Sequence, residues 1–412
     1  MTLIRSVPIL LAVLVCAGAA CAQDTPAQDT PAQDTPTEGT IRFATFNASL
    51  NRGEAGQLIA DLSDPAAEQP SRVAAIIQHV DPDVILINEF DYDEGGEAAR
   101  LFIDNFLAIS QEGMEPWVPE AWYSAPVNTG VPTGLDFNRD GVTDGPDDAY
   151  GFGFFPGQYG MLVLSKFPIA EDDVRTFQNF LWADMPAPRL PSDPESGGEG
   201  DWYSPEMLEV FRLSSKSHWD VPIAIAGHTV HALVSHPTPP AFDGPERRNQ
   251  LRNADEVQFW IDYISGESYM TDDAGAAGGL PEGASFVIMG DQNLDPLDGD
   301  GVSAVMADLL ASDRITDPLP ASEGGVEDAE RDGGANAGHQ GDPRYDTSDF
   351  FDGEGGAGNL RVDYALPSRD LEVAGSGVFW PLSTDPLADL LGTEDAPTTD
   401  HRLVWVDIVV PQ

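Results

Sequence analysis

The stretch that decides the fold is RVAAIIQHVDPDVILINE, residues 72–89. Its first half repeats apolar side chains at i, i+3, i+4 and i+7, which predicts a helix from Arg72 to Val80. A turn that contains proline follows, and the apolar run 84–88 then has the length and composition of a buried strand. This strand delivers an acidic residue, Glu89, to its carboxyl end.

Short apolar strands and helices continue on both sides of this stretch. Upstream, Ile41–Asn47 predicts a first strand that ends on a polar residue. Downstream, the sequence predicts strands at 161–164, 230–235, 286–289, 361–366 and 403–410, and helices at 253–264 and 302–310. Strands interspersed with helices favour a single α/β (α+β) domain over 41–412, rather than a barrel or a bundle.

The amino-terminal residues 1–22 have the features of a signal peptide. A short region with Arg5 is followed by the apolar stretch 7–20 and by Ala20-Cys21-Ala22, a small-residue cleavage site. We therefore expect export, to a secreted or periplasmic location. The alternative is a lipoprotein acylated at Cys21. No segment is long and apolar enough to predict a transmembrane helix.

Residues 23–40 have the composition of a linker. The unit Ala-Gln-Asp-Thr-Pro occurs three times between Ala22 and Pro36, and its side chains cannot build a core. Both cysteines, Cys16 and Cys21, lie in the leader, so the mature chain has no intramolecular disulfide. Its core, alone or with bound metal, must hold it together.

The composition is strongly acidic. The chain has 412 residues, 41% of them hydrophobic, which is enough for the core of one large domain. Its 20 Lys and Arg stand against 70 Asp and Glu, a net charge of −50. This balance excludes a basic surface that follows a nucleic-acid backbone by charge alone, so a phosphate partner must be held locally. Such a surface is typical of a protein that stays soluble in a salty medium.

Two long insertions interrupt the alternation of strands and helices. Segment 93–157 is rich in Gly, Pro and Asp, and segment 184–219 is rich in Pro, Ser and Gly. A third stretch, 323–359, is rich in Gly and Asp. All are long for loops of a compact domain, and such loops are usually functional or disordered.

Polar side chains lie at or beside the predicted strand ends, where the sites of α/β proteins gather. They are Asn47, Glu89, His236, Asp291, Asn293, Asp363, Asp400 and His401. Each alone is typical of a turn former or of a hydrogen-bonded polar residue, and only the set points to chemistry.

The set favours phosphate chemistry with a divalent cation. Asn47 and Glu89 offer oxygen ligands of the kind that Mg²⁺ takes when it also touches a substrate phosphate. Asp291 and Asn293 point the same way from an extended segment. One of them can orient or deprotonate water while the other donates to a phosphoryl oxygen.

Positive charge for a phosphate is scarce and local. His401, beside Asp400, would be an imidazolium if Asp363 accepts a hydrogen bond from its second ring nitrogen. Lys216 and His218 stand close together in the acidic chain. For these two, binding of the substrate phosphate competes with an ordinary surface loop.

Seven short motifs follow one another along the chain. They are Thr45-Phe46-Asn47, Ile87-Asn88-Glu89, the strand 160–169, Ser235-His236, Gly290-Asp291-Gln292-Asn293, Arg361-Val362-Asp363-Tyr364 and Thr399-Asp400-His401. In this order they resemble the endonuclease/exonuclease/phosphatase superfamily, the metal-dependent phosphoesterases that include DNase-I-like nucleases, sphingomyelinases and inositol-phosphate phosphatases. The resemblance runs from Ile41 to Val410.

The resemblance implies a four-layered sandwich, in which two face-packed sheets lie between outer helices and the site occupies the cleft at the strand ends. It also implies that Glu89 binds an essential Mg²⁺ or Mn²⁺ with help from Asn47 and Asp400. The chain departs from the family pattern at Asn88 and Thr399, where Gln and Ser are usual, and in its insertions. The insertions leave the choice of substrate open.

For the other motif residues the resemblance implies roles in hydrolysis. Asp291 would activate the attacking water, Asn293 would hold a non-bridging oxygen, and His236 would assist the leaving group. His401, oriented by Asp363, would stabilise the charge of the transition state.

The segment 136–147 has the spacing of a calcium loop. Oxygen-bearing side chains occupy positions 1, 3, 5, 9 and 12, with glycine at position 6. The expected ligands are Asp136, Asn138, Asp140, Val142 (through its carbonyl), Asp144 and Asp147. The spacing is that of an EF-hand or dockerin-type loop, although the last residue is Asp rather than Glu. The alternative is a solvated acidic turn; bound Ca²⁺ would stiffen the 93–157 insertion.

The sequence therefore predicts an exported, monomeric, divalent-metal-dependent phosphoesterase that hydrolyses phosphodiesters or phosphomonoesters with activated water. One alternative is a secreted nuclease that acts on DNA or RNA. An alternative of another class is a non-catalytic calcium-binding surface module. The complete set of Glu89, Asp291, Asn293 and His401 argues against that module.

Overall fold

The computed structural model describes residues 39–393 and 395–410, which belong to one compact unit, Ala32–Gln412. The expected signal peptide (1–22) and nearly all of the expected linker (23–40) lie outside the described residues. Within the described residues, no helix has both the length and the apolar character needed to cross a bilayer.

The first sheet has six strands. Their order is β12 (Glu372–Val378), β15 (Val404–Val409), β1 (Ile41–Asn47), β2 (Val84–Asn88), β4 (Met161–Ser165) and β3 (Ala121–Tyr123). β1 and β2 run parallel, with Asn47 opposite Asn88 at their carboxyl ends. The polar residues that end these two strands are therefore neighbours.

The second sheet has five strands. Their order is β11 (Asp363–Pro367), β8 (Ser285–Asp291), β7 (His228–Ser235), β6 (His218–Ile225) and β5 (Arg175–Thr176). β7 and β8 run parallel, and β11 lies antiparallel to β8 with Asp363 opposite Asp291. A carboxylate from each of two strands is thus placed side by side.

The two sheets pack face to face around one apolar core. Phe43 and Val163 of the first sheet belong to the same buried cluster as Val234 and Met289 of the second. Successive side chains of a strand point to opposite faces of its sheet. The residues that alternate with these core residues therefore point to the outer faces of the two sheets.

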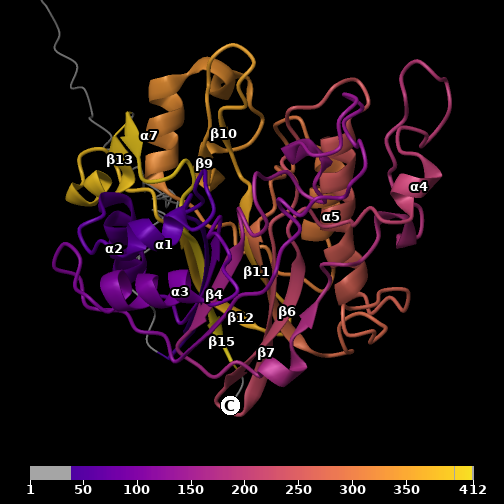
Figure 1. Cartoon of the computed structure of the whole chain (residues 1–412). Helices are drawn as coiled ribbons and strands as arrows, with labels where there is room; N and C mark the ends of the chain where they lie inside the picture. Colours follow the sequence, from indigo (N-terminus) through magenta and orange to yellow (C-terminus); the bar gives the residue numbers. More distant parts are fainter. Residues whose placement is uncertain (1–38, 394, 411–412) are drawn as a thin grey trace, which may run out of the picture. The chain divides into compact units, whose positions relative to one another are not determined.

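Helices cover the outer face of each sheet (Figure 1). α1 (Gln57–Leu62), α2 (Glu68–Val80) and α3 (Glu97–Phe102) pack on the six-stranded sheet, and α5 (Arg248–Ile264) and α6 (Ser303–Leu310) pack on the five-stranded sheet. α2 buries its i, i+3, i+4, i+7 stripe, as the spacing predicts. The expected four-layered α/β (α+β) sandwich is confirmed.

The insertions contain more regular structure than the sequence suggests. Segment 93–157 holds α3 and the edge strand β3, segment 184–219 includes the start of β6, and segment 323–359 holds the helix α7 (Glu323–Asp332). The expectation of long loops there is therefore wrong in part. These elements are short or begin with polar residues, so they lack a readable period.

The remaining elements are small. They comprise α4 (Pro205–Leu208), the pairs β9 (Ser348–Asp349) with β10 (Asn359–Leu360) and β13 (Gly392–Thr393) with β14 (Ala396–Pro397), a π-helical turn at Ile103–Leu107, and 3₁₀ turns at Pro146–Asp148, Glu171–Asp173, Trp182–Asp184, Gly334–Gly338, Pro343–Tyr345 and Pro386–Leu391.

Candidate active site

Asn88 ties the carboxyl ends of the two sheets together. Its Nδ2 donates to the carbonyl oxygen of Ser235 at 3.2 Å, and its Oδ1 accepts from the backbone N–H of Asp291 at 3.2 Å. Asn88 belongs to β2, while its partners belong to β7 and β8. The side chain of Asn88 therefore reaches from one sheet to the other.

Asp291 lies at the centre of the polar cluster. Its Oδ2 accepts from Asn47 Nδ2 at 3.0 Å and lies 3.3 Å from His236 Nε2 and 3.6 Å from His401 Nε2. Burial alone would raise the pKa of the Asp291 carboxyl, but the charge of His401 and the donors around it outweigh burial. The pKa of Asp291 is therefore held well below its usual value, and the side chain is a carboxylate.

His401 forms a hydrogen-bonded chain with Asp363 and Thr347. His401 Nδ1 lies 2.8 Å from Asp363 Oδ2, and the same oxygen accepts from Thr347 Oγ1 at 2.9 Å. Burial opposes a charged ring, but Asp363 and Asp291 outweigh it and raise the pKa of His401 well above its usual value. Burial also raises the pKa of Asp363, to about 6. The arrangement presents an imidazolium whose Nε2 faces Asp291.

His236 is the neutral counterpart of His401. Burial and the nearby charge of Lys216 lower the pKa of His236 to about 4. Its Nδ1 is buried and has no hydrogen-bond partner within the described residues. The two histidines flank the same carboxylate in opposite protonation states, which gives the site one acid and one neutral ring.

Asn293 adopts a backbone conformation that turns the chain after β8. Its φ is 51°, its backbone N–H donates to Asp291 Oδ1 at 2.8 Å, and its Nδ2 donates to the carbonyl of Pro237 at 3.1 Å. Asn tolerates the left-handed region better than most residues. The turn fixes Asn293 beside Asp291.

Glu89 follows β2 in a left-handed conformation with φ of 59°. Positive φ is costly for such a residue and clusters at functional positions. Burial raises the pKa of Glu89 to about 7, although the nearby charge of His401 and the side chain of Asn47 act to lower it. Among the described residues, no Lys or Arg forms an ion pair with Glu89.

The donor set fits a divalent cation. Glu89 and Asn47 would contribute oxygens, and a cation there would compensate the half-buried carboxylate of Glu89, which forms no ion pair with a described Lys or Arg. Asp291, Asp363 and His401 also have ligand atoms within 4.8 Å of one another. Asp400 lies on the solvent side, with its side chain 53% exposed and Oδ1 3.9 Å from His401 Nε2.

The structure brings Lys216 to the site but not His218. Lys216 is buried, shares a cavity with Glu89, and its Nζ donates to the carbonyl of Pro237 at 3.4 Å. His218 is fully buried in β6, where Ser214 lies 2.6 Å from Nδ1 and the carbonyl of Glu256 lies 2.9 Å from Nε2. Burial lowers the pKa of His218 to about 3. The expected substrate-binding role of His218 is therefore corrected to a structural one.

Two residues that the sequence analysis missed position the loops of the site. The carboxylate of Glu256 accepts from the backbone N–H groups of Ser215 and Thr238, both at 2.6 Å. Asn253 Nδ2 donates to the carbonyls of Thr238 and Gln292, both at 2.9 Å. Glu256 precedes Trp260 by four residues, so it lies on the apolar face of α5. A charged residue on the apolar face of a helix is the sequence signal that could have identified it.

The 136–147 segment folds as a tight turn around its first residue. The backbone N–H groups of Asp140 and Gly141 donate to the two oxygens of Asp136, at 3.0 and 2.9 Å. Asp147 Oδ1 instead lies 3.2 Å from Arg248 Nη2. Among the described residues, two groups of three acidic or His side chains have ligand atoms close enough together to hold a metal ion. Neither group includes a residue of 136–147.

The sequence profile of the Endonuclease/Exonuclease/phosphatase family matches residues 44–401. The chain belongs to this family. The matched region contains all the strand-end residues described above, from Asn47 to His401, and the family's members are hydrolases that act on phosphate esters. This chain is therefore placed in that class of enzyme.

Solved structures with a similar backbone are distant in sequence. An endonuclease/exonuclease/phosphatase from Beutenbergia cavernae is 15% identical, with 90% of this chain and 72% of that chain covered and a TM-score of 0.45. A family protein from Leptotrichia buccalis is 13% identical, with 89% and 99% covered and a TM-score of 0.47. A mannosyl-6-phosphatase from Bacteroides thetaiotaomicron is 12% identical, with 90% and 100% covered and a TM-score of 0.43. Curated proteins yielded no significant match.

Proposed function

We propose that the protein is an exported, divalent-metal-dependent phosphoesterase that hydrolyses its substrate by in-line attack of water. The observation that carries the proposal is the position of Asp291, an ionised carboxylate 3.3 Å from His236 and 3.6 Å from His401. The family match, to hydrolases of phosphate esters, supports this proposal.

The carboxylate of Asp291 orients the attacking water. Its low pKa keeps it ionised, so it accepts a hydrogen bond from water at neutral pH. Asn293 is fixed beside it and donates to a non-bridging oxygen of the phosphate. Both side chains act from a turn that hydrogen bonds hold in place, which lowers the cost of ordering the reactants.

His401 stabilises the negative charge that develops on the phosphoryl group. Its imidazolium is held by Asp363, which in turn is held by Thr347, so the ring is oriented before the substrate arrives. His236 is neutral because its pKa is lowered. It can therefore protonate the leaving oxygen only after it has taken up a proton from a neighbouring group.

Glu89 and Asn47, with Asp400 on the solvent side, would hold the divalent cation. Bound Mg²⁺ or Mn²⁺ supplies Lewis-acid stabilisation of the phosphate oxygens. Lys216 lies near Glu89; burial lowers the pKa of its ammonium group, and the carboxylates of Glu256 and Glu89 oppose this shift.

A substrate panel tests this proposal. The release of p-nitrophenol from bis-p-nitrophenyl phosphate and from p-nitrophenyl phosphate is measured in high salt with Mg²⁺, Mn²⁺, Ca²⁺ or EDTA, alongside nicking of plasmid DNA. We expect hydrolysis of at least one ester that EDTA abolishes and Mg²⁺ or Mn²⁺ restores. Nicked plasmid would identify the nuclease alternative, and a folded protein inactive on all three substrates would contradict the proposal.

The export and calcium expectations are proposals with their own tests. Fractionation of cells that express the full chain should find the protein outside the cytoplasm and shortened at its amino terminus, and an acylated Cys21 would identify the lipoprotein alternative. For the 136–147 loop, EDTA should lower the melting temperature and Ca²⁺, unlike Mg²⁺, should restore it. An unchanged melting curve would favour the solvated acidic turn.

A further inference from the structure

A cavity of about 610 Å³ opens from the candidate active site. Glu89 and Lys216 lie in its wall, so a phosphate bound at the proposed metal site would border the cavity. Its size is within the range that encloses a small organic molecule. The cavity therefore has room for a substituent of the phosphate.

Six aromatic side chains line this cavity, which we call the aromatic cavity. They are Phe137, Phe152, Tyr159, Tyr203, Phe211 and Phe242. Phe137 and Phe152 come from the 93–157 insertion, Tyr203 and Phe211 from the 184–219 insertion, Tyr159 from the residues just before β4, and Phe242 from the segment before α5, so the insertions supply four of the six rings.

The aromatic cavity has a rigid floor and an exposed rim. Phe137 and Tyr203 are buried and both pack on Phe211, with ring centroids 4.5 and 4.8 Å from it. At the rim, Phe152 is 49% exposed and Phe242 is 94% exposed. Large apolar side chains that stay in water around a concave surface are typical of a ligand site.

The cavity offers little charge for a second phosphate. Arg248 lies 3.2 Å from Asp147 and 3.8 Å from Glu246, so its charge is compensated. Arg252 donates to the carbonyls of Leu213, Arg212 and Tyr150 and so supports the backbone. Lys216 lies near Glu89, where the reacting phosphate would bind.

A buried hydroxyl adds one polar contact to the apolar walls. Thr238 lines the cavity, and its Oγ1 is buried without a hydrogen-bond partner in the described part of the chain. A buried polar atom without a partner is costly, and a bound ligand would satisfy it.

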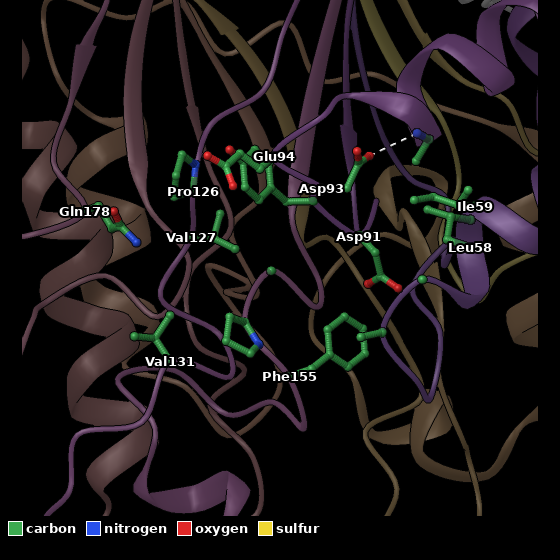
Figure 2. A pocket seen from close by; sticks show the side chains of 16 residues that line it. Leu58, Ile59, Asp91, Asp93, Glu94, Pro126, Val127, Val131, Phe155 and Gln178 are labelled. Atoms are coloured by element: carbon green, nitrogen blue, oxygen red, sulfur yellow. Dashed lines mark hydrogen bonds between the residues drawn. The ribbon is translucent and has the colours of Figure 1, made fainter.

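The other hollows around the site are acidic. Figure 2 shows Asp91, Asp93 and Glu94 on the walls of a second hollow, of about 370 Å³. Asp91 is two residues after Glu89 in the sequence. A third hollow, of about 930 Å³, contains Asp400 together with Asp328, Asp332, Asp349 and Asp352. Its arginines, Arg331 and Arg402, are paired with Asp328 and Asp349. A polyanion that extends from the active site into either hollow would meet like charge.

We propose that the aromatic cavity binds an aromatic or similarly apolar group esterified to the reacting phosphate, so that the enzyme acts on small phosphate esters of this kind rather than on polynucleotides. The proposal rests on the proposed phosphoesterase function and specifies the substrate class. The phosphate lies beside Glu89 and Lys216, the ring lies between the buried floor and the exposed rim, and Thr238 bonds a polar atom of the ring substituent.

Calorimetric titration of the full chain in the presence of Mn²⁺ tests the proposal without requiring turnover. Phenylphosphonate and methylphosphonate carry the same charged group and differ only in the ring. We expect phenylphosphonate to bind about tenfold more tightly, because the cavity removes the ring from water. In the Phe152→Ala/Phe242→Ala variant this preference should fall to about two- to threefold. These two rings are exposed, so the fold does not depend on them.

Phe351→Ala is the matched control, because Phe351 is 72% exposed but lines the hollow with Asp400. It should keep the full preference for phenylphosphonate. Equal binding of the two phosphonates, an unchanged preference in the double variant, or tighter binding of a short oligothymidylate would each overturn the proposal. Ring selectivity in a protein that hydrolyses no phosphate ester would support the ligand class and overturn the proposed function instead.

Discussion

At the residue scale, the site is a set of carboxyl and imidazole groups whose pKa values are pushed apart. Asp291 stays ionised because donors surround it, and His401 stays protonated because two carboxylates face it. His236 stays neutral because it is buried next to Lys216. Distinct environments thus give chemically similar groups distinct roles.

Removal of the charge that faces His401 should shift the pH profile of the reaction. In Asp363→Asn the pKa of His401 falls, so the ring loses its proton at a lower pH. The alkaline limb of the plot of kcat against pH therefore moves to lower pH. We expect kcat at pH 8 to fall by about 10²-fold. The pH–rate profiles of wild type and variant are compared, with Asp370→Asn, an exposed carboxyl three residues beyond the end of β11, as control. An unshifted alkaline limb would contradict the role of Asp363.

Asp346 makes the stability depend on pH in the opposite sense from most carboxyls. Burial and the neighbouring Asp295, Asp298 and Asp342 raise its pKa to about 8. In the unfolded chain this carboxyl ionises near pH 4. Its contribution to the free energy of unfolding therefore becomes steadily less favourable as the pH rises from about 4 to 8, and it is fully unfavourable above pH 8.

Asp346→Asn should therefore stabilise the fold by about 1–3 kcal/mol at pH 8.5 and change little at pH 4. Chemical denaturation at the two pH values measures this difference. An equal effect at both pH values, or destabilisation at pH 8.5, would be inconsistent with a raised pKa.

At the element scale, α5 both covers the second sheet and positions the loops of the site. Its buried Trp260 and Val257 pack in the outer core, while Glu256 and Asn253 bind the backbone of the segments that carry Lys216, His236 and Asn293. One helix therefore couples the packing of the sheet to the geometry of the site.

Glu256→Gln should impair both stability and catalysis. The amide can accept only at one oxygen and places an N–H donor against the N–H of Ser215 or Thr238. We expect a loss of about 2–3 kcal/mol in the free energy of unfolding and a fall in kcat larger than the change in KM. Denaturation and steady-state kinetics test this, with Glu267→Gln, exposed just after α5, as control. Wild-type values for both would contradict the positioning role.

Elements with an apolar signature were predictable and the others were not. The strand Val84–Asn88 is buried along its whole length and reads as a continuous apolar run. The edge strand Glu372–Val378 is half exposed and contains two glycines, so it carries no such run. The strand expected at 361–366 begins only at Asp363.

The same reasoning explains which site residues the sequence placed. Asn47 and Asp291 end strands that the sequence predicts, Glu89 follows one and His401 precedes one, and these strand ends converge in the sandwich. His218 could not be placed because its partners, Ser214 and the carbonyl of Glu256, are set by tertiary packing. From the sequence alone, a histidine whose hydrogen-bond partners are set by tertiary packing cannot be distinguished from one that binds the substrate.

At the scale of the whole molecule, the full sequence has a net charge of −50, and the residues that the structure describes include no cysteine. Like charges that are exposed repel over about 10 Å at 0.1 M salt and over about 3 Å at 1 M. Folding brings these charges together, so the compact state is destabilised by their repulsion at low salt.

The melting temperature should therefore rise by about 5 °C or more between 0.1 and 1 M NaCl. A scan in sucrose at matched osmolality controls for the general exclusion of cosolutes. A melting temperature independent of salt would contradict a dominant role for charge repulsion.

The most direct test of the central claim is hydrolysis by Asp291→Asn. The account predicts that this variant loses about 10³-fold or more in kcat with Mg²⁺ or Mn²⁺ on every ester that the wild type cleaves, because the amide cannot serve as the central carboxylate. As in Glu256→Gln, the amide sets an N–H donor against an existing donor, here Asn47 Nδ2 or the backbone N–H of Asn293, so the melting temperature should fall. The circular dichroism spectrum should stay that of the folded wild type and of Asp308→Asn, an exposed control on α6. Hydrolysis at the wild-type rate by a folded Asp291→Asn variant would contradict the account.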